Sequence, residues 1–119
     1  MKIGIDIGGS HIAIGLVDNK GSILTKKEKN IKSEDRKNIE KLIEETIAIA
    51  INEILRDNKI KAEEIEMIGI ACPGTSKEGQ IIKAENLGIH NFPIVEKLQK
   101  YFSAPIKLSN DGKCAGLCE

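Results

Sequence analysis

The sequence predicts an α/β fold with a mixed sheet, and three observations carry this prediction. Apolar residues alternate with other residues in two successive runs, 2–7 and 11–18, which is the period of a β-strand. From residue 33 to residue 55 the apolar spacing changes to three and four, which is the period of one helical face. Short apolar runs typical of buried strands then return. We therefore expect strands first, and helices that alternate with strands afterwards.

Residues 2–29 are expected to form three strands in an antiparallel meander. The first strand ends at Gly8 and Gly9, which supply the turn into a second strand over residues 11–18. The Asn-Lys-Gly segment at 19–21 has the residues of a tight hairpin and leads into the third strand. A helix in this region would contradict the fold prediction.

The long helix that follows has a recognisable start. Ser33 is a suitable N-cap, and Glu34 and Asp35 place negative charge in the first turn, where the helix dipole favours it. After a polar stretch, the segment MIGIACPG predicts a buried strand that ends at Pro73 and Gly74.

The last third of the chain predicts one more helix and one more strand. Residues 72–88 are expected to form a Pro-Gly loop, an extended return and a second polar loop. Pro93 opens a short helix, and Pro105 starts the strand PIKLS. A further helix is expected to begin near residue 110.

Composition narrows the classes of function. The chain has 119 residues, 40% of them hydrophobic, which fits one domain with a packed core. Lysine plus arginine equals aspartate plus glutamate at 18 each, and aromatic residues are 3%, so neither nucleic acid nor an anionic membrane surface is expected as a partner. The sequence has no membrane span and no secretion signal at its start, and its three cysteines suit a reducing compartment. A cytoplasmic protein is expected.

The segment DIGGSH, residues 6–11, is the first candidate site. Glycines allow backbone N–H groups to approach an anion closely, Ser10 adds a hydroxyl donor, and the Asp6 carboxylate beside a phosphate suits a hydrated Mg²⁺ ion. The alternative reading is an ordinary tight hairpin. The segment is neither a P-loop nor a dinucleotide fingerprint.

The segment SNDGKC, residues 109–114, is the second candidate. Asn110 and Asp111 follow a predicted strand, and a carboxylate at such a strand end can accept a proton from a substrate hydroxyl. The alternative is that one of them caps the next helix. The third candidate, residues 72–88, could shape a pocket or could be a plain surface connection.

Taken in this order, DIGGSHIAIGLVD, CPGTSKEG with KAENLG, and NDGKCAGLCE resemble the ROK (repressor, ORF, kinase) family over nearly the whole chain. The resemblance implies an actin-like, ribonuclease-H-like α/β domain, the first of two domains in a kinase that phosphorylates a hexose or amino sugar with ATP and Mg²⁺. The sugar would lie in the cleft between the two domains. A homodimer is implied for the full-length protein.

The resemblance also assigns roles to residues on the sugar side. Asp111 would be the catalytic base that takes the proton from the sugar hydroxyl, and Asn110 would hydrogen-bond the sugar. Gly74, Thr75 and Asn86 would complete the sugar-binding residues of this domain.

On the phosphate side, Gly8, Gly9, Ser10 and His11 would lie against the phosphates of ATP, and Asp6 would hold Mg²⁺ through water. Ser10 replaces the threonine that is usual in the family and keeps the hydroxyl.

The family's second phosphate motif, its adenosine pocket and its zinc motif lie in the half that would follow residue 119, so we expect the isolated chain to be inactive. Cys114 and Cys118 share one face of the expected last helix; they are read as small buried residues, with a zinc site as the alternative. Zinc is expected only in the second domain.

Three other functions remain open. The ROK family includes sugar-responsive transcriptional regulators, although we expect no helix-turn-helix ahead of the first strand. A non-catalytic sugar-binding or dimerisation domain is the second alternative. An activator ATPase that also begins with a DIG-type loop is the third, and the ENLG and NDG segments fit it poorly.

Overall fold

A computed structural model of the chain describes residues 1–8, 11–31, 39–72, 75–77, 80–84 and 89–109. The elements, in chain order, are β1 (Lys2–Ile7), β2 (His11–Val17), β3 (Ile23–Asn30), α1 (Ile39–Asp57), the short 3₁₀ helix η2 (Ala62–Glu64), β4 (Met67–Ala71), β5 (Thr75–Lys77), β6 (Gln80–Ala84), β7 (Ile89–Phe92), α2 (Ile94–Leu98) and β8 (Ile106–Ser109).

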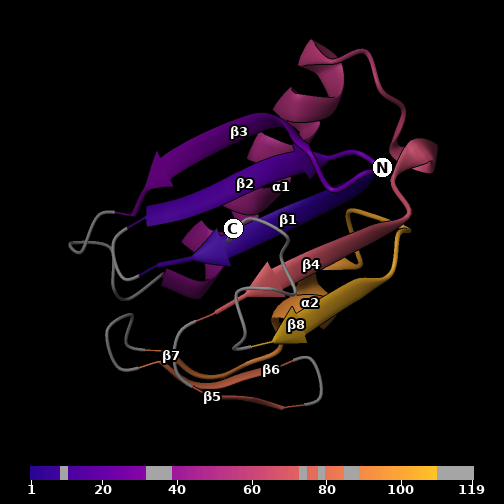
Figure 1. Cartoon of the computed structure of the whole chain (residues 1–119). Coiled ribbons are helices and arrows are strands. Elements are labelled where there is room, and N and C mark those ends of the chain that lie inside the picture. Colours follow the sequence, from indigo (N-terminus) through magenta and orange to yellow (C-terminus); the bar gives the residue numbers. More distant parts are fainter. Residues whose placement is uncertain (9–10, 32–38, 73–74, 78–79, 85–88, 110–119) are drawn as a thin grey trace.

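The main sheet has five strands in the order β3-β2-β1-β4-β8. β1, β2 and β3 form the expected antiparallel meander, and β4 and β8 join β1 as parallel strands on its other side. Figure 1 shows the arrowheads of β1, β4 and β8 pointing the same way. The predicted mixed sheet is therefore confirmed, and the carboxyl ends of its three parallel strands share one edge.

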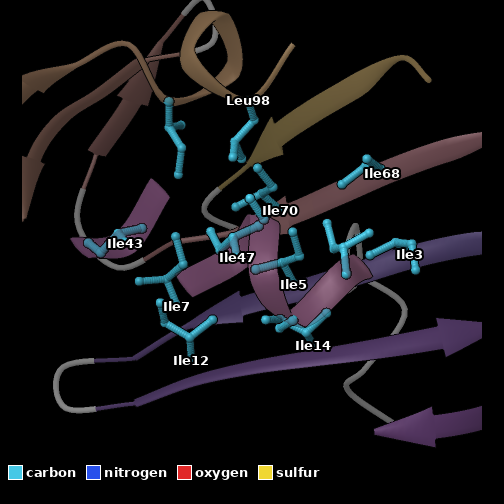
Figure 2. Close-up of a cluster of buried hydrophobic side chains, with 14 of the residues drawn as sticks. Ile3, Ile5, Ile7, Ile12, Ile14, Ile43, Ile47, Ile68, Ile70 and Leu98 are labelled. Atoms are coloured by element: carbon cyan, nitrogen blue, oxygen red, sulfur yellow. The ribbon is translucent and has the colours of Figure 1, made fainter. Parts of the chain in front are cut away.

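Alternation along the strands places isoleucines on one face of this sheet, where α1 and α2 cover them. Figure 2 shows the isoleucines of β1 and β2 pointing toward Ile43 and Ile47 of α1, with Leu98 of α2 beside Ile70. Ile5, Ile47 and Ile70 are each 0% exposed. Burying such a side chain contributes roughly 1.5–3 kcal/mol, so this layer is the main source of stability.

The turn between β2 and β3 is stabilised by the side chain of Asp18 as well as by a glycine. In the β2–β3 hairpin, Gly21 has a φ of 86° and its N–H donates to the carbonyl of Asp18 at 3.1 Å. The Asp18 side chain also accepts hydrogen bonds of 2.9 Å from the N–H groups of Lys20 and Ser22. The hairpin prediction is confirmed, and Asp18 is the residue that closes the turn.

The long helix ends two residues later than the apolar spacing suggested, at Asp57 rather than Leu55. The N–H of Ile60 donates to the carbonyl of Leu55 at 2.8 Å, and Lys59 has a φ of 54°. This is the left-handed C-terminal cap that satisfies the last carbonyls of a helix, here with lysine instead of glycine. The expected start at Ser33, with Glu34 and Asp35, lies outside the described residues.

A second, three-stranded antiparallel sheet, β5-β6-β7, stands where only an extended return was expected. Ile81 of β6 and Phe92 at the end of β7 are 0% and 1% exposed and belong to the same core as α1 and β1. The strand β7, in which His90 is the register partner of Lys83 in β6, was not predicted from the sequence. Strands of three to five residues are too short for a clear alternating pattern, so the sequence did not predict this sheet.

β3 attaches to α1 mainly through charge. Lys27 forms ion pairs with Asp57 at 3.1 Å and with Glu53 at 3.6 Å, and Lys29 pairs with Glu53 at 3.2 Å. Thr25 adds a hydroxyl hydrogen bond of 3.1 Å to the side chain of the residue that follows α1.

Within the described ranges, no helix is long and apolar enough to cross a membrane.

Replacing Ile47 with alanine should lower the free energy of unfolding by about 2–5 kcal/mol, because the cavity would open at the centre of the buried layer. Ile49 is a matched control on the same helix, since its side chain is 58% exposed. Denaturant unfolding measures both variants. Equal losses for Ile47→Ala and Ile49→Ala would contradict the described packing of α1.

Acid should weaken the attachment of β3. The ammonium group of Lys29, 3.2 Å from the Glu53 carboxylate, lowers the pKa of Glu53 from its ordinary value of 4.5, and the hydrogen bond from Lys27 lowers the pKa of Asp57 from 3.8. Because each pKa is lower in the folded state, the stabilisation is complete above the ordinary values and is lost as the pH falls through the folded pKa values. Unfolding at a series of acidic pH values should show a shallower dependence for Glu53→Gln than for Glu45→Gln; equal slopes would contradict the assignment.

Candidate functional site

The carboxyl edge of the main sheet brings together the strand ends from which the DIGGSH and SNDGKC motifs begin. Asp6 in β1 is the register partner of Ala71 in β4, and Ala71 is the register partner of Ser109 in β8. Neighbouring strands are about 4.8 Å apart, so the ends of β1 and β8 are separated by roughly 10 Å. In open α/β sheets, ligands bind outside such strand ends.

The turn after β1 is held by a short backbone hydrogen bond. The N–H of Gly8 donates to the carbonyl of His11 at 2.7 Å. A Cβ atom on Gly8 would lie 3.1 Å from that carbonyl oxygen and 3.4 Å from the Cε1 atom of the His11 ring. A side chain at Gly8 would therefore force the His11 backbone to shift by a few tenths of an ångström, and the exposed imidazole of His11 lies beside the same position. Gly9 and Ser10 lie outside the described residues.

The Asp6 side chain is half-buried at this edge. No hydrogen bond or ion pair from the described part of the chain engages its carboxylate. A carboxylate in this state fits a hydrated Mg²⁺ ion, which keeps most of its water and takes few protein ligands. Within the described ranges there is no cluster of three or more histidine, cysteine or acidic side chains that would hold a metal without such help.

The β4 and β8 ends are joined one residue beyond the ladder. The backbone N–H of Cys72 donates to the carbonyl of Ser109 at 3.0 Å. That carbonyl belongs to the peptide bond leading into Asn110, so the chain enters the Asn110-Asp111 segment from a fixed point. Asn110 and Asp111 themselves lie outside the described residues.

The middle motif is described only in part. Thr75 is the first residue of β5 and pairs with Lys83 of β6, whereas Gly74 and Asn86 lie outside the described residues. β5 contacts β8, and in Figure 1 the β5-β6-β7 sheet lies beside the carboxyl ends of the parallel strands. The small sheet therefore borders the candidate site.

Sequence reasoning missed two contributors to this edge. The Cys72–Ser109 hydrogen bond joins residues far apart in the chain, so no local spacing could predict it. The contact between β5 and β8 depends on a sheet that was itself not predicted. The strand ends that precede Gly74 and Asn110, and the position of Asp6 near the end of β1, were predicted from the sequence.

The chain is similar to known sugar kinases over nearly its whole length. The chain is 29% identical over 119 residues to a glucokinase of Halalkalibacterium halodurans, covering 98% of this chain and 35% of the relative. The structure of a ROK family glucokinase from Streptomyces griseus in complex with glucose and AMPPNP matches with a TM-score of 0.67 and 25% identity, over 92% of this chain and 32% of that one. The chain thus spans about a third of the length of these proteins.

The relatives are not all kinases. A xylose repressor of Caldicellulosiruptor bescii is 28% identical over 120 residues, covering 98% of this chain and 29% of the repressor. The structural likeness to sugar kinases confirms the expected actin-like fold with its mixed sheet. The ROK family profile matches residues 2–119, and the chain therefore belongs to the ROK family.

Proposed function

We propose that the protein containing this chain transfers the γ-phosphate of ATP to a hydroxyl group of a hexose or an amino sugar, and that the chain is its N-terminal domain. The observation that carries the proposal is the shared register of Asp6, Ala71 and Ser109. It sets the carboxyl ends of β1 and β8 at one edge of the sheet, roughly 10 Å apart, and the DIGGSH turn and the Asn110-Asp111 segment continue the chain from these two ends. A nucleotide phosphate and a small sugar fit side by side over such a span.

The phosphates are proposed to bind at the turn between β1 and β2. Backbone N–H groups of Gly8 and Gly9, the hydroxyl of Ser10 and the ring of His11 would contact the phosphate oxygens. Asp6 would hold Mg²⁺ through water, and the ion would neutralise charge on the phosphates. The close contact of Gly8 with His11 supports this arrangement, because it keeps the backbone compact at Gly8 and places the His11 ring beside the proposed phosphate position.

The sugar is proposed to bind beyond the carboxyl ends of β4 and β8. Asn110 would hydrogen-bond one sugar hydroxyl, while Gly74, Thr75 and Asn86 would line the pocket. Asp111 would accept the proton of the attacking hydroxyl as that oxygen forms its bond to the γ-phosphorus and ADP leaves. Phosphoryl transfer depends on positioning and charge neutralisation, so few groups are required.

The remaining parts of the site are proposed to come from a second domain of the protein. That domain would supply the second phosphate motif, the adenosine pocket and any zinc site, and the protein would act as a homodimer. The 119-residue chain alone is then expected to bind ATP very weakly and to phosphorylate no sugar.

A sugar-responsive transcriptional regulator is the second candidate function. The similarity to the Caldicellulosiruptor bescii xylose repressor favours it, because kinases and repressors share this domain. A regulator would bind sugar without consuming ATP. An assay of sugar-dependent ADP release by the longer protein distinguishes the two candidates.

In the longer protein, Asp111→Asn should reduce turnover by about 10²- to 10⁴-fold, because asparagine cannot accept the proton. ATP affinity and melting temperature should change little, since asparagine caps a helix about as well as aspartate. Steady-state kinetics and thermal unfolding of the same variant test this. Unchanged turnover would remove Asp111 from the mechanism and leave helix capping as its role.

In the longer protein, Gly8→Ala should weaken ATP binding roughly tenfold or more, because the new methyl group would push against His11 and widen the turn. Gly21→Ala is the control: Gly21 also sits in a tight turn, with a φ of 86°, but open space surrounds it. That variant should lose stability through backbone strain and keep its ATP affinity. Calorimetric ATP binding that responds equally to both substitutions would contradict a phosphate site at the first turn.

A further inference from the structure

On the face of the sheet that α1 covers, rows of apolar side chains run across neighbouring strands, and these rows end at β2. Ile12, Ile14 and Leu16 are each 0% exposed beneath α1. Their partners on β3 are Lys29, Lys27 and Thr25, in the same order. β3 therefore continues each buried row with a polar side chain, and none of its eight residues is buried.

Charges replace apolar packing at this edge. Glu53 lies between Lys27 and Lys29, with ion pairs of 3.6 and 3.2 Å, and Asp57 pairs with Lys27 at 3.1 Å. The lysine side chains are only 24% and 36% exposed, so their aliphatic stems cover the flank of the core while the charged ends reach α1. The outer edge of β3 has no strand partner in the described sheet.

β3 has a backbone ladder on one side only, and partly exposed ion pairs and one hydrogen bond join it to α1, so it should open at a lower free energy than the central strands β1 and β4. Salt screens charges of this kind, whereas it leaves the burial of the isoleucine rows intact. The last residue of β3, Asn30, is the register partner of His11. Release of β3 would therefore reach the first turn, where His11 accepts the hydrogen bond from Gly8.

We propose that β3 is a releasable edge strand, fastened to α1 by the Lys27–Glu53–Lys29 and Lys27–Asp57 ion pairs, which opens from β2 in a salt-dependent transition that leaves the core folded. When β3 opens, His11 loses Asn30 as its register partner. The proposal concerns the fold and does not depend on the proposed kinase activity.

Residue-resolved amide hydrogen exchange tests the proposal. At low salt, Glu53→Gln should accelerate exchange of the β3 amides by about threefold to tenfold, because it removes ion pairs to both lysines. Adding sodium chloride should accelerate the same amides in the unmodified protein and have a smaller effect in Glu53→Gln. The amides of β1 and β4 should keep their rates under all these conditions.

Glu45→Gln is the matched control, because it removes the same charge from the same helix. Its ion pair, with Lys41 at 4.0 Å, does not reach β3. Equal acceleration of β3 exchange by Glu45→Gln and Glu53→Gln would overturn the proposal. So would β3 amides that exchange as slowly as those of β1 at every salt concentration, and this second comparison needs only the unmodified protein.

Discussion

The parallel pairing of β1, β4 and β8 is the constraint on which the candidate site depends. Side chains alternate between the two faces of a strand, so a slip of one residue would move every isoleucine out of the core. Ile5 and Ile7 are buried on either side of Asp6, and Ile70 immediately precedes Ala71. Burial of these isoleucines thus fixes both the register of the strands and the direction in which Asp6 points.

Because the strand register depends on buried isoleucines, a layer of aliphatic side chains determines where the polar candidate residues lie. The core holds α1 and α2 against one face of the sheet, and Ile81 and Phe92 tie the small β5-β6-β7 sheet to the same cluster. The candidate residues then follow directly from strand ends: the first turn from β1, the Pro-Gly loop from β4 and the Asn110-Asp111 segment from β8. The positions of the strand ends are therefore fixed by the packing of the buried side chains between the sheet and the two helices. Beyond β2 that packing ends, and β3 relies on charge instead.

Much of this architecture could be predicted from the sequence because its signals are local. Alternation in β1 and β2, the residues of the β2–β3 turn and the prolines before α2 and β8 each act over a few residues. The end of α1 was missed because its cap places a lysine, Lys59, in a backbone conformation that usually takes glycine. The small sheet was missed because β5, β6 and β7 have three, five and four residues, too few to show a clear alternation of apolar residues. For the site, the sequence indicated the strand ends, whereas the spacing between them came only from the register.

In the proposed site, the nucleotide phosphate and the sugar meet at the carboxyl ends of β1, β4 and β8. A structure of the longer protein with a sugar and a non-hydrolysable ATP analogue tests it most directly. We expect the γ-phosphate at the turn between Gly8 and His11, and a sugar hydroxyl within hydrogen-bonding distance of the Asp111 carboxylate. A sugar bound away from Asp111, or phosphates bound away from that turn, would contradict the account.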